Sequence, residues 1–251
     1  MNTSKPIKFY GVLAGAAMLV GMSSANAQIQ LFNVNAGQTG DPAMSGAAVL
    51  GSSGDTWNAY QVGWYSWGGD SYTLTLADTL GSTAAGITAQ IGNYITGYSD
   101  YSGGTTANPN SLMGDYITSG NSGDGWPIKV TLNNLPASMS YELVVYSAGD
   151  GSGQGATINI TDSSFSTVFQ TANTTGADRD IAGGLGDAYQ VFTGTTGAGG
   201  NFYFDVANTS NWHALNGFQL ELTAVPEPST LALAGMGGLI ALGWLCRRAV
   251  R

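Results

Sequence analysis

Apolar and polar residues alternate with a period of two along nine short stretches of the chain. These stretches are 30–35, 60–67, 71–77, 128–132, 141–147, 156–161, 189–193, 201–206 and 217–223. Such alternation predicts β-strands that turn one face toward a core and the other toward solvent. Gly-Gly, Ser-Gly, Asp-Gly and Asn-Asn pairs between the stretches are typical of turns.

Long amphipathic helices are missing, although residues 111–117 could form one or two helical turns. No segment repeats at a fixed period, which argues against a propeller or a solenoid. We therefore expect an all-β body over 28–224, folded as an antiparallel β-sandwich with a jelly roll as the expected arrangement. A chain of that length suits one β-domain.

The N-terminus has the three parts of a secretory signal peptide. Two lysines precede an apolar run, and small residues follow it: Lys5, Lys8, 9–22, Ala25 and Ala27. Signal peptidase accepts only small side chains beside the bond that it cleaves. We expect it to remove residues 1–27, so that Gln28 begins the mature chain.

The C-terminus combines a proline-rich segment, an uncharged run and a cluster of arginines. In order, these are Val225, Pro226, Glu227, Pro228 and Ser229, then 231–245, then Arg247, Arg248 and Arg251. As a helix, the run would extend about 22 Å, which is short against about 30 Å of bilayer hydrocarbon. The arginines favour the cytoplasmic side. We expect a transmembrane segment that holds the protein transiently in the inner membrane; a permanent single-pass anchor is the alternative.

This tail, 225–251, resembles the PEP-CTERM sorting signal of Gram-negative bacteria. In that family an exosortase, an integral-membrane cysteine protease or transpeptidase, recognises the signal, and the carriers accompany exopolysaccharide and biofilm systems. The resemblance implies an exported protein with signal peptidase and an exosortase as processing partners. It implies a final place in the cell envelope, at the cell surface or in the extracellular matrix.

The body is also similar to galactose-binding-like jelly rolls, in a form that recurs among exported proteins with this tail. The resemblance lies in the stretches "GAAVLGSSGDTWN", "SLMGDYI", "SYELVVYSAGDGSG" and "LNGFQLELT". The residues that carry it are Asp55, Trp57, Asn58, Asp115, Tyr116, Asn216 and Gly217. It implies the fold and brings no catalytic motif with it.

The charge of the body limits its partners. Fifteen acidic residues stand against two basic ones, Lys129 and Arg179, which gives a net charge of −13. Such a surface repels phosphate backbones and anionic lipid, so we expect no nucleic-acid partner. The only cysteine, Cys246, lies in the tail, which leaves the body without a disulfide or a thiolate site.

Aromatic residues crowd the stretch "WNAYQVGWYSWGGDSY". Flat rings on a strand can stack on the apolar faces of sugars, while nearby polar groups bind hydroxyls. The candidate glycan platform consists of Trp57, Asn58, Trp64, Trp67 and Asp70. The alternative is that these rings fill the core of a glycine-rich sandwich.

Three aspartates in "GADRDIAGGLGDAY" form a candidate calcium site, because carboxylates and carbonyls are the ligands of this ion. They are Asp178, Asp180 and Asp187. The alternative is a solvated loop in which Arg179 neutralises its neighbours. Apart from calcium, we expect no cofactor.

No catalytic constellation stands out. The lone histidine, His213, lacks a Gly-x-Ser-x-Gly elbow, and Glu142 and Glu221 are the only glutamates of the body. We expect a non-enzymatic protein with a structural or adhesive role linked to exopolysaccharide. A carbohydrate-binding module is the alternative, and a glycan-active enzyme is a more distant one.

The two terminal signals predict both ends of the mature protein. Intact-mass and terminal-peptide analysis of the protein from producing cells should find Gln28 at the start and no Cys246. Stable retention of Cys246 in cells with an intact exosortase would contradict the sorting prediction.

Overall fold

In the residues that the structure describes, every regular element is a strand. The computed structural model describes 29–40, 44, 46–63, 72–83, 85–92, 95–99, 112–119, 126–149, 153–177, 183–208 and 213–225. The strands are β1 (Ile29–Gln38), β2 (Asn58–Val62), β3 (Tyr72–Thr75), β4 (Thr88–Gly92), β5 (Ile95–Ser99), β6 (Asp115–Ser119), β7 (Ile128–Asn133), β8 (Met139–Tyr146), β9 (Ala156–Thr161), β10 (Val168–Asn173), β11 (Tyr189–Thr195), β12 (Phe202–Asn208) and β13 (Gly217–Ala224). Residues Gln28–Val225 form one compact unit.

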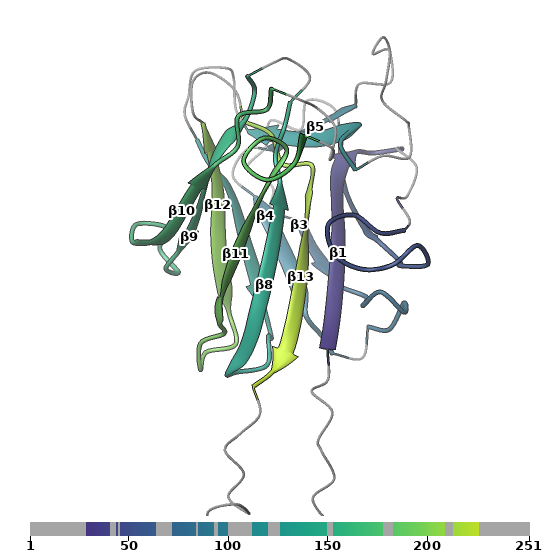
Figure 1. Cartoon of the computed structure of the whole chain (residues 1–251), viewed down its shortest axis with the longest axis vertical. Helices are drawn as coiled ribbons and strands as arrows, with labels where there is room; N and C mark the ends of the chain where they lie inside the picture. The colour runs from purple at the N-terminus through teal and green to yellow at the C-terminus, as the bar shows by residue number, and fades with distance from the viewer. Residues whose placement is uncertain are drawn as a thin grey trace, which may run out of the picture. The chain divides into compact units, whose positions relative to one another are not determined.

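Most of these strands belong to two sheets that face each other (Figure 1). The five-stranded sheet has the order β11-β8-β13-β1-β2, and the six-stranded sheet has the order β10-β9-β12-β7-β4-β3. β5 and β6 pair separately, at the end of the sandwich where β1 finishes. Ile29 pairs with Thr223, so the described chain begins and ends at the opposite end.

The order of pairing is that of a jelly roll. Four antiparallel pairs are nested along the chain, namely β1 with β13, β7 with β12, β8 with β11 and β9 with β10. Each pair lies inside the previous one in sequence, and successive pairs belong to alternate sheets. This is a doubled-over hairpin wrapped into two sheets, so the predicted jelly-roll sandwich is confirmed.

One pair departs from the expected antiparallel pattern. β2 runs parallel to β1, from the Val34–Asn58 pair to the Gln38–Val62 pair. A parallel neighbour needs a long crossover. The segment after β1 supplies it, and its part 46–57 crosses the outer face of the five-stranded sheet before β2 begins.

All nine predicted stretches contain a strand, but four strands were not predicted, namely β4, β5, β6 and β10. The expected helical turns at 111–117 are wrong, because β6 occupies 115–119. β6 is buried at every position, and β10 is exposed or partly exposed at every position. Neither therefore shows the alternation on which the prediction depended.

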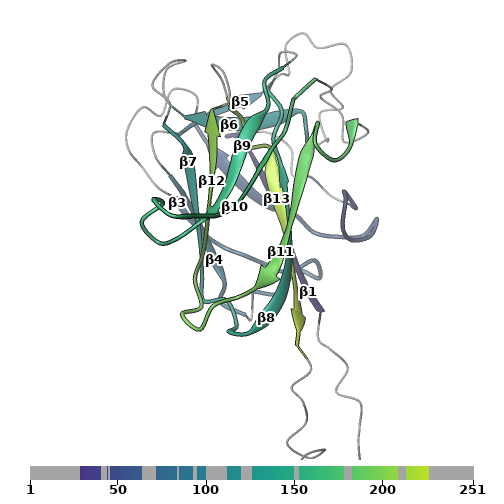
Figure 2. The same ribbon diagram turned by 60° about the vertical axis from the view of Figure 1, so that its left-hand side comes forward.

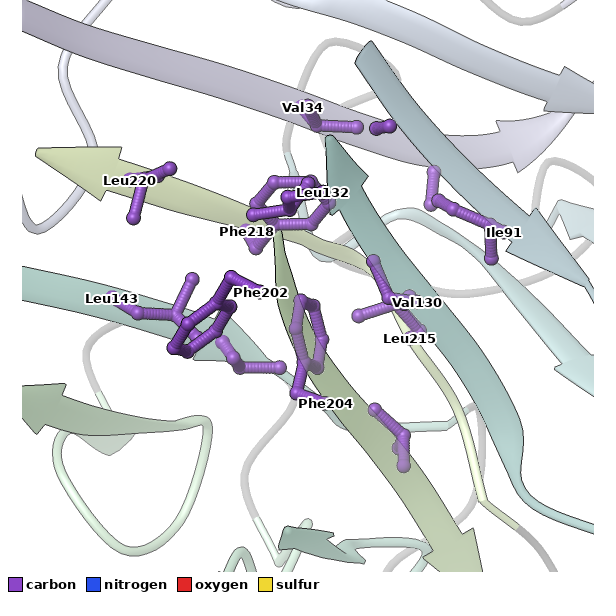
Figure 3. Packing of buried hydrophobic residues seen from close by; sticks show 14 of the residues in the cluster. Val34, Ile91, Val130, Leu132, Leu143, Phe202, Phe204, Leu215, Phe218 and Leu220 are labelled. Carbon is purple, nitrogen blue, oxygen red and sulfur yellow. The ribbon is translucent and has the colours of Figure 1, made fainter. Parts of the chain in front are cut away.

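The core fills the space between the two sheets (Figure 3). Phe204 of β12 and Phe218 of β13 meet across it edge to face, with ring centroids 5.5 Å apart. Val130 and Leu132 of β7 pack beside them, and Leu143 of β8 lies on the opposite sheet. With no cysteine in the body, this apolar contact is the main source of its stability.

A second apolar cluster covers part of the outer face of the five-stranded sheet. Its buried members are Met44, Trp57, Leu112, Met113, Val144, Tyr146, Ala148 and Ala188. Gln219 of β13, which is fully buried, binds the covering segment 46–57 by accepting from Leu50 N at 2.9 Å and donating to Leu50 O at 3.0 Å. This face of the sandwich is therefore covered over part of its area.

Side chains also bridge the edges of the sandwich. Between the edge strands β10 and β11, Gln170 donates to the Thr193 carbonyl and Gln190 donates to the Asn173 carbonyl. At the other side, the Tyr60 hydroxyl donates to the Ile91 carbonyl at 2.7 Å. The two glutamine contacts occupy backbone groups of β10 and β11 that an open edge would offer to another chain.

The predicted signal peptide 1–27 and transmembrane segment 231–245 lie outside the described residues. Among the residues that are described, no helix has the length and apolar character needed to cross a membrane. Both segments stay predictions.

Removing the ring at the centre of the core should strongly destabilise the body. Phe204 is fully buried, so Phe204→Ala should lower the free energy of unfolding by about 3–5 kcal/mol. Denaturant titration measures this change. Phe169→Ala is the matched control, because this ring is 65% exposed, and its loss should cost about 0.5 kcal/mol or less. Equal effects would contradict the assignment of the core.

Candidate functional site

The outer face of the six-stranded sheet is lined by hydroxyl and amide side chains. Along β7, β9 and β12 the alternate residues pack in the core, so the residues between them point outward. Most of the outward residues are exposed or partly exposed. They are Thr73, Thr75, Thr88, Gln90, Lys129, Thr131, Asn133, Thr157, Asn159, Thr171, Asn173 and Tyr203, with Thr161 and Asp205 buried among them.

The strand register arranges these side chains in rows across the sheet. One row holds Thr73, Gln90, Thr131, Tyr203 and Thr161. The next row holds Lys129, Asp205, Asn159 and Thr171. Neighbouring strands lie about 4.8 Å apart, so hydrogen-bonding groups recur at that spacing. Such a face can form hydrogen bonds with several hydroxyls of an extended polymer at once.

Asp205 lies at the centre of this face. It is 5% exposed, and Asn159 Nδ2 donates to its Oδ1 at 2.8 Å. Burial raises the pKa of Asp205, while the Asn159 hydrogen bond and the charge of Lys129 act in the opposite direction. The sequence analysis did not single out these residues. Their signal in the sequence was the outward half of the alternation in 128–132, 156–161 and 201–206.

The candidate glycan platform divides into two groups. Trp57 is 5% exposed, and its Nε1 donates to the Gly46 carbonyl at 2.7 Å. Asn58 is 9% exposed, and its side chain binds backbone groups of Asn33 and Ala77. These two residues pack inside the body and offer no ring or amide to solvent. Trp64, Trp67 and Asp70 lie outside the described residues, where the platform stays a prediction.

Only one member of the candidate calcium site can be placed. Asp187 Oδ1 accepts from Ala177 N at 2.7 Å and from the Thr175 hydroxyl. Asp178 and Asp180 lie outside the described residues. The described residues contain no group of three or more acidic, histidine or cysteine side chains that could hold a metal ion. Calcium binding by this loop stays a prediction.

Several residues that carry the resemblance to galactose-binding-like domains have structural contacts. Asn216 joins three segments, since its Oδ1 accepts from Ala148 N and its Nδ2 donates to the Asp115 carbonyl. The Asp115 carboxylate accepts from Asn35 Nδ2 at 3.3 Å. Asp55 accepts from Ser52 N and Oγ within its own turn. These buried polar groups hold the ends of strands together.

His213 forms a buried pair with Ser119. The histidine is 3% exposed, and its Nε2 lies 2.7 Å from Ser119 Oγ, which itself donates to the Trp126 carbonyl. The serine proton is therefore engaged, and Nε2 is the donor to Ser119. A nucleophile and its base would need the opposite direction. Burial lowers the pKa of His213 to about 4.

The two glutamates of the body lie directly opposite each other. Glu142 of β8 pairs with Glu221 of β13 in the register of the five-stranded sheet. Both alternate with core residues and therefore point to the same outer face. Glycosidase carboxylates flank the scissile bond from two sides. A pair that projects from one flat face does not provide that arrangement.

The comparison with family models concerns the C-terminus. Residues 224–248 match the PEP-CTERM protein-sorting motif, so the chain carries this motif as the sequence indicated. Of the matched residues, Ala224 and Val225 are described; Ala224 is partly exposed, and Val225 is 45% exposed. The motif marks export and sorting to the cell envelope in Gram-negative bacteria. No curated protein matches the chain.

Several solved structures are similar to parts of this chain, at low identity and with TM-scores below 0.5. A native family 35 carbohydrate-binding module from Clostridium thermocellum is 17% identical with a TM-score of 0.33, over 53% of this chain and 90% of that one. The plant receptor-like kinase ANX2 is 12% identical with a TM-score of 0.44, over 80% and 50%. The C-terminal CBM6 of the laminarinase LamC from Zobellia galactanivorans is 17% identical with a TM-score of 0.27, over 43% and 79%. The jelly-roll assignment rests on the strand pairing itself.

The buried histidine predicts a loss of stability in mild acid. In the unfolded chain His213 gains its proton near pH 6.5, whereas in the folded chain it does so only near pH 4. The contribution of neutral His213 to folding stability is therefore fully present above pH 6.5 and is lost as the pH falls toward 4. The contribution of His213 should amount to about 2 kcal/mol between pH 7 and pH 5.

Denaturant unfolding at both pH values measures this effect. His213→Gln keeps a donor for Ser119 but cannot ionise, so its stability should fall by correspondingly less between pH 7 and pH 5. Carboxylates titrate in both proteins and cancel from the comparison. Parallel pH profiles would show that His213 does not control the acid sensitivity.

Proposed function

We propose that this exported protein binds polysaccharide without cleaving it, as a structural or adhesive component of the cell envelope or the extracellular matrix. An exosortase processes its C-terminus. The sorting motif supports export and surface sorting. The role of the body is inferred from its surface.

The observation that carries the proposal is the contrast between the two broad faces of the sandwich. The outer face of the five-stranded sheet is covered around Val144 and Tyr146 by the segment 46–57, and its other end carries the pair Glu142 and Glu221. The outer face of the six-stranded sheet carries threonine, asparagine and glutamine side chains in rows that cross the strands. Hydroxyls and amides both donate and accept, as sugar hydroxyls do.

The charge of the body supports the same class of ligand. A net charge of −13 disfavours nucleic acid and anionic lipid, but it does not oppose a neutral polymer. Sugars are recognised by hydrogen bonds and apolar contact and need no opposite charge. A sparsely charged face rich in hydroxyls suits that kind of recognition.

The arrangement of potential catalytic groups supports binding without hydrolysis. Glu142 and Glu221 project side by side from the covered sheet, away from the hydroxyl-rich face. His213 is buried against Ser119. None of these residues lies on the surface that we assign to the polymer.

Incubation of the full-length protein with the exopolysaccharide of the producing cells tests the proposal. The protein, solubilised in detergent, should be retained on the immobilised polymer, and no reducing sugar should be released. The double variant Glu142→Gln/Glu221→Gln should be retained equally. Sugar release that this variant abolishes would instead indicate a glycan-active enzyme, and absence of retention would refute polysaccharide binding.

A further inference from the structure

The connection between β9 and β10 folds over the polar face of the six-stranded sheet (Figure 2). The Phe165 ring from this turn meets the Tyr203 ring of β12 edge to face, with centroids 5.9 Å apart. Lys129 Nζ of β7 lies 4.9 Å from the centroid of the same ring. The turn therefore brings an aromatic side chain over a face that is otherwise polar.

The turn is held in this position by its own side chains. Asp162 Oδ1 accepts from Ser166 N at 3.0 Å and from Thr167 N at 3.3 Å, and the Ser164 hydroxyl donates to the same carboxylate. The Ser166 hydrogen bond is the main reason that the pKa of Asp162 lies well below its usual value. Phe165 has a φ of 58°, which is unfavourable for an aromatic residue. A strained backbone conformation of this kind persists only where the surrounding structure holds the residue in place.

The floor beside this ring has hydrogen-bonding capacity that the protein does not use. Thr161 is 3% exposed, and its Oγ1 has no hydrogen-bond partner in the described part of the chain. It is in register with Tyr203, next to the row that contains Asp205 and Asn159. Buried hydroxyls are nearly always paired, so the unpaired Thr161 hydroxyl is an unused hydrogen-bonding group in the floor of the face.

We propose that the hairpin-tip cluster, formed by Lys129, Asn159, Thr161, Phe165, Tyr203 and Asp205, binds a neutral sugar unit of the polymer. This inference rests on the proposed function and identifies the site that carries it. Phe165 and Tyr203 provide apolar ring surface for the C–H face of a sugar. The carboxylate of Asp205 accepts from hydroxyls, the ammonium group of Lys129 donates to them, and Thr161 can do both.

The same cluster disfavours the other ligands that an aspartate could attract. Lys129 is in register with Asp205, and its positive charge opposes a divalent cation at the carboxylate. Asp205 and the net charge of the body oppose a uronic acid or a sulfated sugar. An uncharged sugar avoids both penalties.

Two single variants test the site in the full-length, detergent-solubilised protein. Phe165→Gly removes the ring and suits the positive φ, so the turn should keep its shape. Asp205→Asn keeps the size of the side chain but removes the charged acceptor. Phe169→Ala is the matched control, because it removes an exposed ring from the same hairpin. Binding is measured to a neutral glucan, galactan and mannan, to polygalacturonate, and to the polysaccharide of the producing cells.

We expect at least one neutral polymer to bind, and both Phe165→Gly and Asp205→Asn to weaken it about tenfold, with Phe169→Ala unchanged. If binding persists in both variants, the hairpin-tip cluster is not the site, although the proposed function stands. Preference for polygalacturonate would overturn the neutral class. If no polymer is retained, the proposed function and this inference both fail.

The melting temperature of Phe165→Gly provides the control for folding. If it is unchanged, the loss of binding in this variant is not caused by unfolding. Phe165→Gly decides the outcome if Asp205→Asn does not fold.

Discussion

The paired hydrogen bonds between the side chain of Gln219 and the backbone of Leu50 hold the covering segment 46–57 on the five-stranded sheet. Tyr146 strengthens this contact by donating to Gln219 Oε1 and accepting from Val49 N. Both side chains are fully buried beneath the segment, so its backbone supplies hydrogen bonds that water cannot supply there. This constraint covers part of one face of the sandwich, and we assign the polymer to the opposite face, that of the six-stranded sheet.

The remaining architecture follows from the need to build a stable exported body without disulfides. Apolar contact between the two sheets provides the main stabilisation, with Phe204 and Phe218 at its centre. Glutamine side chains bridge the edge strands β10 and β11, which limits pairing with a second chain. The polar face can then remain rich in hydroxyls and poor in charge, because neither the core nor the edges depend on it.

The histidine–serine pair and the two glutamates suggest catalysis by their residue types, but their contacts do not fit that role. The His213–Ser119 pair is oriented by the Trp126 carbonyl, and the two glutamates share one side of a sheet. In contrast, Asp205 is buried on a face whose side chains are mostly exposed or partly exposed, and this burial raises its pKa. Its neighbours come from β7, β9 and β12, so the cluster exists only after the sheet has formed.

The sequence by itself determined the all-β class, nine of the strands and the sorting motif, because alternation and the three-part tail are local patterns. It did not reveal β6, which is buried throughout, or β10, which is exposed or partly exposed along its length, since neither has two contrasting faces. Only the tertiary structure decided that Trp57 is buried and that Phe165 lies against Tyr203 and Lys129. The physical reason is that burial and side-chain contact depend on which distant segments pack together, whereas periodicity reports only how each segment divides its own two faces.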